Sequence, residues 1–282
     1  MKFTEHRFAT FDGLILYCRD YGAASGSRTP VLCLLGLTRN SHDFHRLACR
    51  IADKGRVLAL DFRGRGRSDY DSNWRNYAME TYVADIRHLL DQFDIRAVVV
   101  VGTSMGGVMA MAMAEQLPDR LVGAVINDIG PELKLTGLAK VLRYMQTDRP
   151  VKTWEAAVAR MKKAFPDLPA HNEEDWLEIA RGTYRENGCG EIEPDWDRSI
   201  LKPLAAAILK PIDLWPLYRA LGERPVVAVR GGTSAILSAS VHQRMCEALP
   251  NVRGVTVPGV GHAPSLVEPE CLEAIHDVFE RA

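Results

Sequence analysis

The longest uncharged stretch of the sequence, residues 97–114, restricts the fold more than any other segment. Its length approaches that of a membrane-spanning helix, but three glycines interrupt it. The first part, Ala97–Val101, is apolar and largely β-branched, whereas Met105–Gln116 is rich in Ala and Met. This pattern predicts a buried strand, a tight turn and a helix, and it argues against a membrane span.

Similar apolar runs alternate with helical patterns along much of the 282-residue chain. This alternation predicts an α/β fold, in which helices flank both faces of a mostly parallel central sheet. The predicted strands are Leu14–Arg19, Val31–Leu35, Val57–Asp61, Ala97–Gly102, Leu121–Asn127, Pro225–Arg230 and Val252–Val257. The predicted helices are Tyr77–Phe93, Met105–Gln116 and Pro269–Arg281.

One long region interrupts the alternation. Residues 131–221 show helical patterns and no clear strand, and they hold four of the five tryptophans. We therefore predict a core of residues 1–130 and 222–282 with a helical insertion between two strands of its sheet. The insertion is either a second helical subdomain with a tryptophan-rich core or a cap over a pocket. We favour the cap, with most of the tryptophans structural.

Composition excludes several classes of function. The formal net charge is −1, and no basic stripe or acidic tail is present, so we expect no nucleic-acid partner. The first residues are charged and lack the apolar run of a signal peptide, which favours a cytoplasmic location. The six cysteines are irregularly spaced without a C-x-x-C pair, so we expect reduced thiols and no metal site. The oligomeric state is not indicated.

Gly102-Thr-Ser-Met-Gly106 joins the predicted strand to the predicted helix. It is a G-x-S-x-G motif in its strand–turn–helix context, where a sharp turn exposes the serine hydroxyl at the sheet edge. The N-terminus of the helix favours negative charge that develops beside the hydroxyl. We predict that Ser104 is a nucleophile.

Together with other segments, this motif resembles the α/β-hydrolase superfamily over nearly the whole chain. The segments that carry the resemblance are Leu34-Leu-Gly-Leu37, Asp61-Phe-Arg-Gly-Arg-Gly-Arg-Ser68, Gly102-Thr-Ser-Met-Gly-Gly107, Arg230-Gly-Gly-Thr-Ser234 and Gly259-Val-Gly-His262. Asn127-Asp-Ile-Gly-Pro131 further resembles a bacterial esterase-like branch.

The resemblance implies an oxyanion hole made of the backbone N–H groups of Leu37 and Met105. Many members of the superfamily have His before the glycine of the first segment, where this chain has Leu35. The donor is a backbone group, so the change need not remove it. The arginine-rich segment, residues 61–68, matches neither phosphate-binding glycine motif, and we interpret it as a structural turn near the active-site face.

His262 follows the last predicted strand, in a loop rich in Gly and Pro. A base near the end of the chain, after the serine, is the order found in α/β-hydrolases. We therefore predict that His262 is the general base.

The third member of the triad poses a problem. The resemblance places an acid at position 235, but the residue there is Ala235, which cannot accept a hydrogen bond from imidazole. Three hypotheses compete: an engineered Asp→Ala substitution, a substitute acid at Asp128 after another strand, and a natural non-catalytic protein. We favour the first, in which the acid is absent and the enzyme is crippled.

The resulting prediction is a serine hydrolase that cleaves a small to medium carboxylic ester or lactone through an acyl-enzyme, without a cofactor. The superfamily also contains carbon–carbon bond hydrolases that act on diketones, and perhydrolases, on the same triad frame. From a different class, a hydrolase-fold protein that only binds a ligand remains an alternative.

Overall fold

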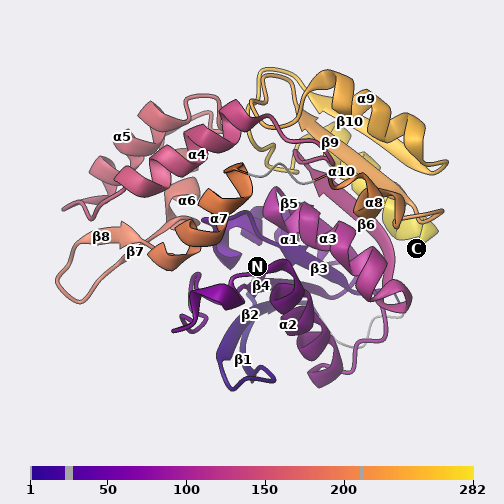
Figure 1. Ribbon diagram of the computed structural model, residues 1–282, viewed down its shortest axis with the longest axis horizontal. Coiled ribbons are helices and arrows are strands. Elements are labelled where there is room, and N and C mark those ends of the chain that lie inside the picture. The colour runs from indigo at the N-terminus through magenta and orange to yellow at the C-terminus, as the bar shows by residue number, and fades with distance from the viewer. Residues whose placement is uncertain (1, 23–27, 210–212) are drawn as a thin grey trace.

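A single eight-stranded sheet forms the centre of the computed structural model, which describes residues 2–22, 28–209 and 213–282. The strand order is β1-β2-β4-β3-β5-β6-β9-β10 (Figure 1). The first hairpin is antiparallel and β2 pairs antiparallel with β4, whereas all other pairs are parallel. The strands are β1 (Thr4–Ala9), β2 (Ile15–Tyr21), β3 (Val31–Leu34), β4 (Val57–Asp61), β5 (Val98–Thr103), β6 (Leu121–Asn127), β9 (Val226–Gly231) and β10 (Val252–Val257).

Helices cover both faces of this sheet, which confirms the predicted fold class. Successive residues of a strand point to opposite faces. In β6, Gly123 faces Val278 of α10, and Ile126 faces Gly107 of α3, so these two helices lie on opposite faces. The helices of this part are α1 (His45–Ile51), α2 (Met79–Gln92), α3 (Met105–Gln116), α9 (Ala239–Ala248) and α10 (Pro269–Arg281).

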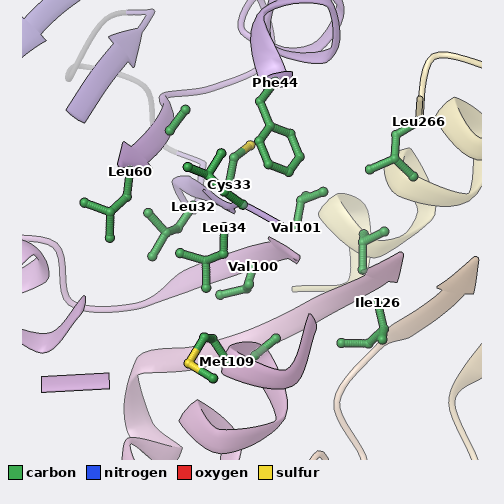
Figure 2. Packing of buried hydrophobic residues seen from close by; sticks show 14 of the residues in the cluster. Leu32, Cys33, Leu34, Phe44, Leu60, Val100, Val101, Met109, Ile126 and Leu266 are labelled. Carbon is green, nitrogen blue, oxygen red and sulfur yellow. The ribbon is translucent and has the colours of Figure 1, made fainter. Parts of the chain in front are cut away.

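The central strands are apolar on both sides because both faces are covered. Figure 2 shows Cys33 and Val101 on the side of Phe44, whereas Leu34 and Val100 lie on the side of Met109. All five residues of β4 are buried. Continuous burial explains why these strands read as uninterrupted apolar runs.

Strand β1 was not predicted from the sequence. It is an edge strand in which only Phe8 is buried, so its sequence is largely polar. Such a strand lacks the apolar run that marks the buried strands. Within the described residues, no helix has both the length and the apolar character needed to cross a bilayer.

An inserted segment, which we define as α4 to α8, follows β6 and precedes β9. Figure 1 shows α4 to α7 gathered beyond one edge of the sheet. Its elements are α4 (Leu135–Thr147), α5 (Trp154–Ala164), α6 (Glu173–Arg181), β7 (Tyr184–Glu186), β8 (Ile192–Pro194), α7 (Leu201–Leu209) and α8 (Trp215–Arg219). The predicted insertion, 131–221, includes residues 210–212, which lie outside the described residues.

The expectation that this segment contains no strand is wrong. β7 and β8 form a short antiparallel hairpin, whose three-residue strands are too short to show a period. At the other end, α8 packs on α3, and the Tyr218 hydroxyl donates to the carbonyl oxygen of Met245 in α9 (2.9 Å). The last helix of the segment therefore contacts the helices that cover the sheet.

Asp195, after β8, attaches the inserted segment to the rest of the protein. Its carboxylate accepts a hydrogen bond from Asn40 Nδ2 (2.8 Å), and its carbonyl oxygen accepts one from the N–H of Gly66 (3.0 Å). Burial, which disfavours the ionised form, raises the pKa of Asp195 to about 7, and the nearby Asp61 adds to the shift. Arg185 opposes the shift from 3.5 Å.

We expect Asp195→Asn to make the stability of the protein less sensitive to pH. An unfolded Asp has a pKa of about 3.9. Between about pH 4 and pH 7 the folded chain therefore holds a proton at Asp195 that the unfolded chain releases, so this group lowers the free energy of unfolding as pH rises. The neutral amide removes that loss. Urea unfolding from pH 5 to 8 should show the variant gaining stability relative to the natural chain as pH rises.

The control is Asp119→Asn, in an exposed turn. The burial argument does not apply there, so it should leave the pH dependence unchanged. A difference between Asp195→Asn and the natural chain that is constant with pH would contradict the assignment to the Asp195 carboxyl.

Candidate active site

Ser104 lies on a sharp turn between β5 and α3, as predicted. Its backbone has φ 52° and ψ −115°, in the positive-φ region that residues with a side chain rarely adopt. The turn is tight, because a Cβ on Gly102 would overlap the carbonyl of Gly106, and one on Gly106 would overlap that of Leu34. The N–H of Ser104 donates to the carbonyl of Asn127 (2.9 Å). Neighbouring backbone therefore fixes the serine at the carboxyl end of β5.

His262 reaches Ser104 from the loop that follows β10. The distance from His262 Nε2 to Ser104 Oγ is 3.0 Å, within hydrogen-bonding range. Two contacts hold the loop: Asn127 Nδ2 donates to the carbonyl of Pro264 (2.9 Å), and the N–H of Gly261 donates to the carbonyl of Asp167 (2.6 Å). The imidazole is thereby brought next to the hydroxyl across 158 positions of sequence.

The expectation that the imidazole lacks a carboxylate is wrong. Asp128, directly after β6, accepts a hydrogen bond from His262 Nδ1 at its Oδ2 atom (2.7 Å). Asp128 is fully buried, and it also accepts hydrogen bonds from the N–H of Gly231 (2.8 Å) and from Ser234 Oγ (2.6 Å). Three donors around a buried carboxylate satisfy it and hold it in one orientation.

Ala235 does not occupy a vacant acid position beside the imidazole. It is exposed, and its backbone faces α4, where a Cβ on Gly137 would overlap its carbonyl. The neighbouring Ser234 provides this loop's side-chain contact to the site, as a donor to Asp128. The loop after β9 therefore supports the carboxylate, which comes from the end of the adjacent strand.

Adjacent parallel strands explain how the acid can come from β6. Asn127 of β6 pairs with Val229 of β9, so the two strands end side by side at the same edge of the sheet. The N–H of Asp128 donates to the carbonyl of Val229 (2.8 Å). A carboxylate attached to either strand end can thus approach the same imidazole nitrogen.

The predicted oxyanion donors lie beside Ser104. A Cβ on Gly36 would come within 3.9 Å of Ser104 Cβ, which places Leu37 next to the nucleophile, and Met105 is the first residue of α3. Within the described residues, neither the N–H of Leu37 nor that of Met105 donates a hydrogen bond to another protein group. Two unused donors next to a hydroxyl nucleophile can stabilise an oxyanion.

A cavity of about 200 Å³ opens onto Ser104 and His262. Much of its wall is apolar and comes from α4, α5 and the loops at the sheet edge. These residues are Ile129, Leu133, Leu138, Val141, Met161, Phe165, Leu168, Ile236 and Leu266. Among the described residues no tryptophan lines it, and Phe44, Tyr144 and Phe165 contribute aromatic rings.

Another part of the wall is polar, and sequence analysis did not find it. Each of its basic side chains contacts an acid: Arg39 contacts Asp43, His42 Nε2 lies 2.8 Å from Glu178, and Arg46 lies 2.8 Å from Asp175. Burial holds the pKa of His42 below the usual value, although Glu178 opposes this effect. Its partner lies 136 positions away, so no local pattern marks the pair.

The described residues contain no group of three or more His, Cys, Asp or Glu side chains placed to hold a metal ion. The site brings together a hydroxyl, an imidazole, a carboxylate and two N–H donors. This set can activate a nucleophile and stabilise negative charge on a carbonyl oxygen.

Comparisons with known proteins identify the family of the chain. Residues 29–269 match the family model of the alpha/beta hydrolase fold. The chain is 29% identical to a 3-hydroxybutyrate-oligomer hydrolase of Cupriavidus necator, covering 89% of this chain and 87% of that protein. It is 28% identical to a 2-(acetamidomethylene)succinate hydrolase of Mesorhizobium japonicum, over 90% and 89% of the two chains. The crystal structure of an alpha/beta hydrolase from Novosphingobium aromaticivorans superposes with a TM-score of 0.92, at 39% identity and 99% coverage of both chains.

We expect Asp128→Asn to slow the reaction of Ser104 with a fluorophosphonate by about 10⁴-fold, because the amide no longer stabilises the required imidazole tautomer and its imidazolium. Ala235→Asp serves as the matched control, since Ala235 is exposed and His262 Nδ1 already contacts Asp128. Its labelling rate should stay within about threefold of the natural chain, as for other surface changes. The measurement is the labelling rate by intact-mass spectrometry. Acceleration in Ala235→Asp, with no loss in Asp128→Asn, would restore position 235 as the acid site.

Proposed function

The chain belongs to the α/β-hydrolase fold family, and we propose that it is an active serine hydrolase that cleaves small to medium carboxylic esters or lactones. One observation carries the proposal: the hydrogen-bonded series Asp128–His262–Ser104 opens into a largely apolar cavity. The imidazole contacts a buried carboxylate, so we propose an active enzyme in place of an inactivated one.

In the proposed mechanism Ser104 Oγ attacks the acyl carbon while His262 Nε2 takes its proton. The carbonyl oxygen becomes an oxyanion, which the N–H groups of Leu37 and Met105 stabilise. When the carbon–oxygen bond to the alcohol breaks, His262 returns the proton to the leaving oxygen. Water then attacks the acyl-enzyme by the same route and regenerates Ser104. Asp128 keeps the proton of neutral His262 on Nδ1 and stabilises the imidazolium.

The inserted segment is proposed to act as a cap that selects the substrate. Helix α4 and the segment from the end of α5 to Leu168 provide much of the apolar wall, including Val141 and Phe165, which suits an alkyl or aryl part of the substrate. The cations of the polar wall already contact acids, so a substrate with several carboxylates would have to displace those partners. This favours an ester over a dicarboxylate.

The substrates in the names of the two relatives differ in their chemical class. A 3-hydroxybutyrate oligomer is an ester, whereas a succinate carries two carboxylates. The paired cations of the cavity make the ester the better proposal for this chain. The diketone, perhydrolase and binding-only alternatives share the fold, and a substrate panel separates them.

We expect the protein to hydrolyse p-nitrophenyl butyrate, a small lactone or a 3-hydroxybutyrate dimer faster than a 1,3-diketone. Ser104→Ala should lower kcat for the ester by about 10⁶-fold, the scale seen when a serine nucleophile is removed. The exposed Ser240 of α9 gives a matched control, Ser240→Ala, which should leave the rate unchanged. Stopped-flow measurement should show a burst of p-nitrophenol equal to the enzyme concentration.

Two outcomes would contradict the proposal. Efficient carbon–carbon cleavage of the diketone without ester turnover would favour the diketone hydrolase. A folded protein that neither cleaves any member of the panel nor labels at Ser104 would favour a binding role.

A further inference from the structure

Arg65 is a fully buried cation without an acidic partner among the described residues. Its guanidinium contacts four uncharged groups: the carbonyls of Leu37 and Arg63, the hydroxyl of Tyr82 and the sulfur of Met105. No described carboxylate lies within 4.0 Å of its nitrogens. Burying an unpaired charge is costly, so its retention calls for a physical reason.

Arg63, two residues earlier, shows the ordinary solution to the same problem. It is equally buried, but its guanidinium contacts three carboxylates: Asp12 at 2.8 Å, Asp71 at 2.7 Å and Asp85 at 2.6 Å. The two arginines therefore share a segment and a degree of burial, and they differ in whether their charge is neutralised. The role of Arg63 is accounted for by this ion-pair cluster, which joins β4 to α2 and to the loop after β1.

The position of Arg65, next to Leu37 and Met105, gives a reason for a charge that no carboxylate neutralises. Its Nε atom donates to the carbonyl of Leu37 (3.0 Å), and Nη2 lies 3.5 Å from Met105 Sδ. These are the two residues that provide the proposed oxyanion donors. We propose that Arg65 is a positioning residue that fixes the oxyanion hole and places a buried positive charge behind it. This inference rests on the proposed function.

The hydrogen bond from Arg65 to the Leu37 carbonyl restrains the orientation of the Leu37 N–H, the proposed oxyanion donor. Arg65 holds the carbonyl of Leu37, and the N–H of Arg39 donates to the carbonyl of Gly36 (3.2 Å). The two peptide planes that flank the Leu37 Cα atom are thereby both fixed. The N–H of Leu37 cannot turn away without breaking one of these bonds, which is the preorganisation that an oxyanion site requires.

Arg65 is itself held rigidly. Nη1 donates to the Tyr82 hydroxyl (2.6 Å), and the guanidinium lies 5.1 Å from the centre of the Tyr82 ring, where cation–π attraction adds to the hydrogen bond. Gly64 and Gly66, on either side, have φ of 75° and 55°, which shows how sharply the backbone bends around Arg65. Its backbone also bridges to Trp196 of the inserted segment.

A fixed charge in this position favours the transition state over the bound ester. The ester carbonyl is neutral in the ground state and carries an oxyanion in the tetrahedral state, so a nearby cation stabilises the second far more than the first. The effect is large because water is excluded around Arg65. The inference therefore predicts a loss of kcat with little change in KM.

The test compares Arg65→Met, which removes the charge and the donors, with Arg65→Lys, which keeps the charge. We expect Arg65→Met to lower kcat for p-nitrophenyl butyrate by about 10- to 100-fold, somewhat less than the loss of a direct oxyanion donor. KM should stay within about threefold, and Arg65→Lys should recover part of kcat. The affinity for phenylboronic acid should fall in parallel with kcat. This inhibitor forms a tetrahedral anion when Ser104 Oγ bonds to boron and its proton passes to His262.

Arg63→Lys is the matched control. It alters an equally buried arginine without touching Leu37 or Met105, so it should lower the melting temperature and leave kcat, measured below that temperature, within about threefold. If Arg65→Met does not fold, Tyr82→Phe tests the same idea. It removes one hydrogen bond to the charged Arg65 and should lower kcat by about tenfold with KM unchanged.

Unchanged kcat and boronate affinity in the folded Arg65 or Tyr82 variants, with ester hydrolysis intact, would overturn the inference and leave the proposed function standing. A parallel rise in KM and fall in affinity for every ligand would also overturn it, because that pattern indicates a general structural role. Absence of hydrolysis in the natural chain would instead overturn the proposed function.

Discussion

The convergence of strand ends at one edge of a parallel sheet is the constraint on which the whole site depends. β5 and β6 are neighbours, and β9 lies next to β6. Ser104 and Asp128 therefore follow adjacent strands, and the loop after β9 surrounds the Asp128 carboxylate with donors. His262 needs only a loop from β10 to lie between them. The backbone at Ser104 and Asp128 has positive φ in both cases, so each side chain is held where the chain leaves its strand.

The inserted segment turns this edge into an enclosed site. Its hairpin region attaches to the core through Asp195 and the loop that contains Gly66, while helix α4 and the segment from the end of α5 to Leu168 provide much of the apolar wall. Ion pairs between the insertion and the core, such as Arg46 with Asp175, contribute to the polar part of the cavity.

Arg63 and Arg65 show how two identical residues in one turn acquire different roles from their surroundings. Carboxylates from two distant parts of the chain, Asp12 and Asp85, neutralise the first. The second contacts the backbone of Leu37 and the sulfur of Met105, and no carboxylate among the described residues neutralises its charge. Both arginines precede a glycine in the same short segment, so the local sequence does not reveal their different roles. Only the contacts made after folding distinguish an ion-pair cluster from a charge beside the oxyanion donors.

The sequence by itself determined the parallel sheet, the Ser104 turn and the candidate base His262, because buried strands, glycine-dependent turns and chain order leave local patterns. It did not determine β1, whose exposed face removes the apolar pattern, or the three-residue strands β7 and β8. Nor did it locate the carboxylate. Position 235 and Asp128 both follow strands that end at the same edge of the sheet. By sequence alone, a carboxylate at either position could contact His262, which lies 134 positions after Asp128. The tertiary structure decided between them, because β6 and β9 pair in a register that buries Asp128 against His262 and leaves Ala235 in solvent.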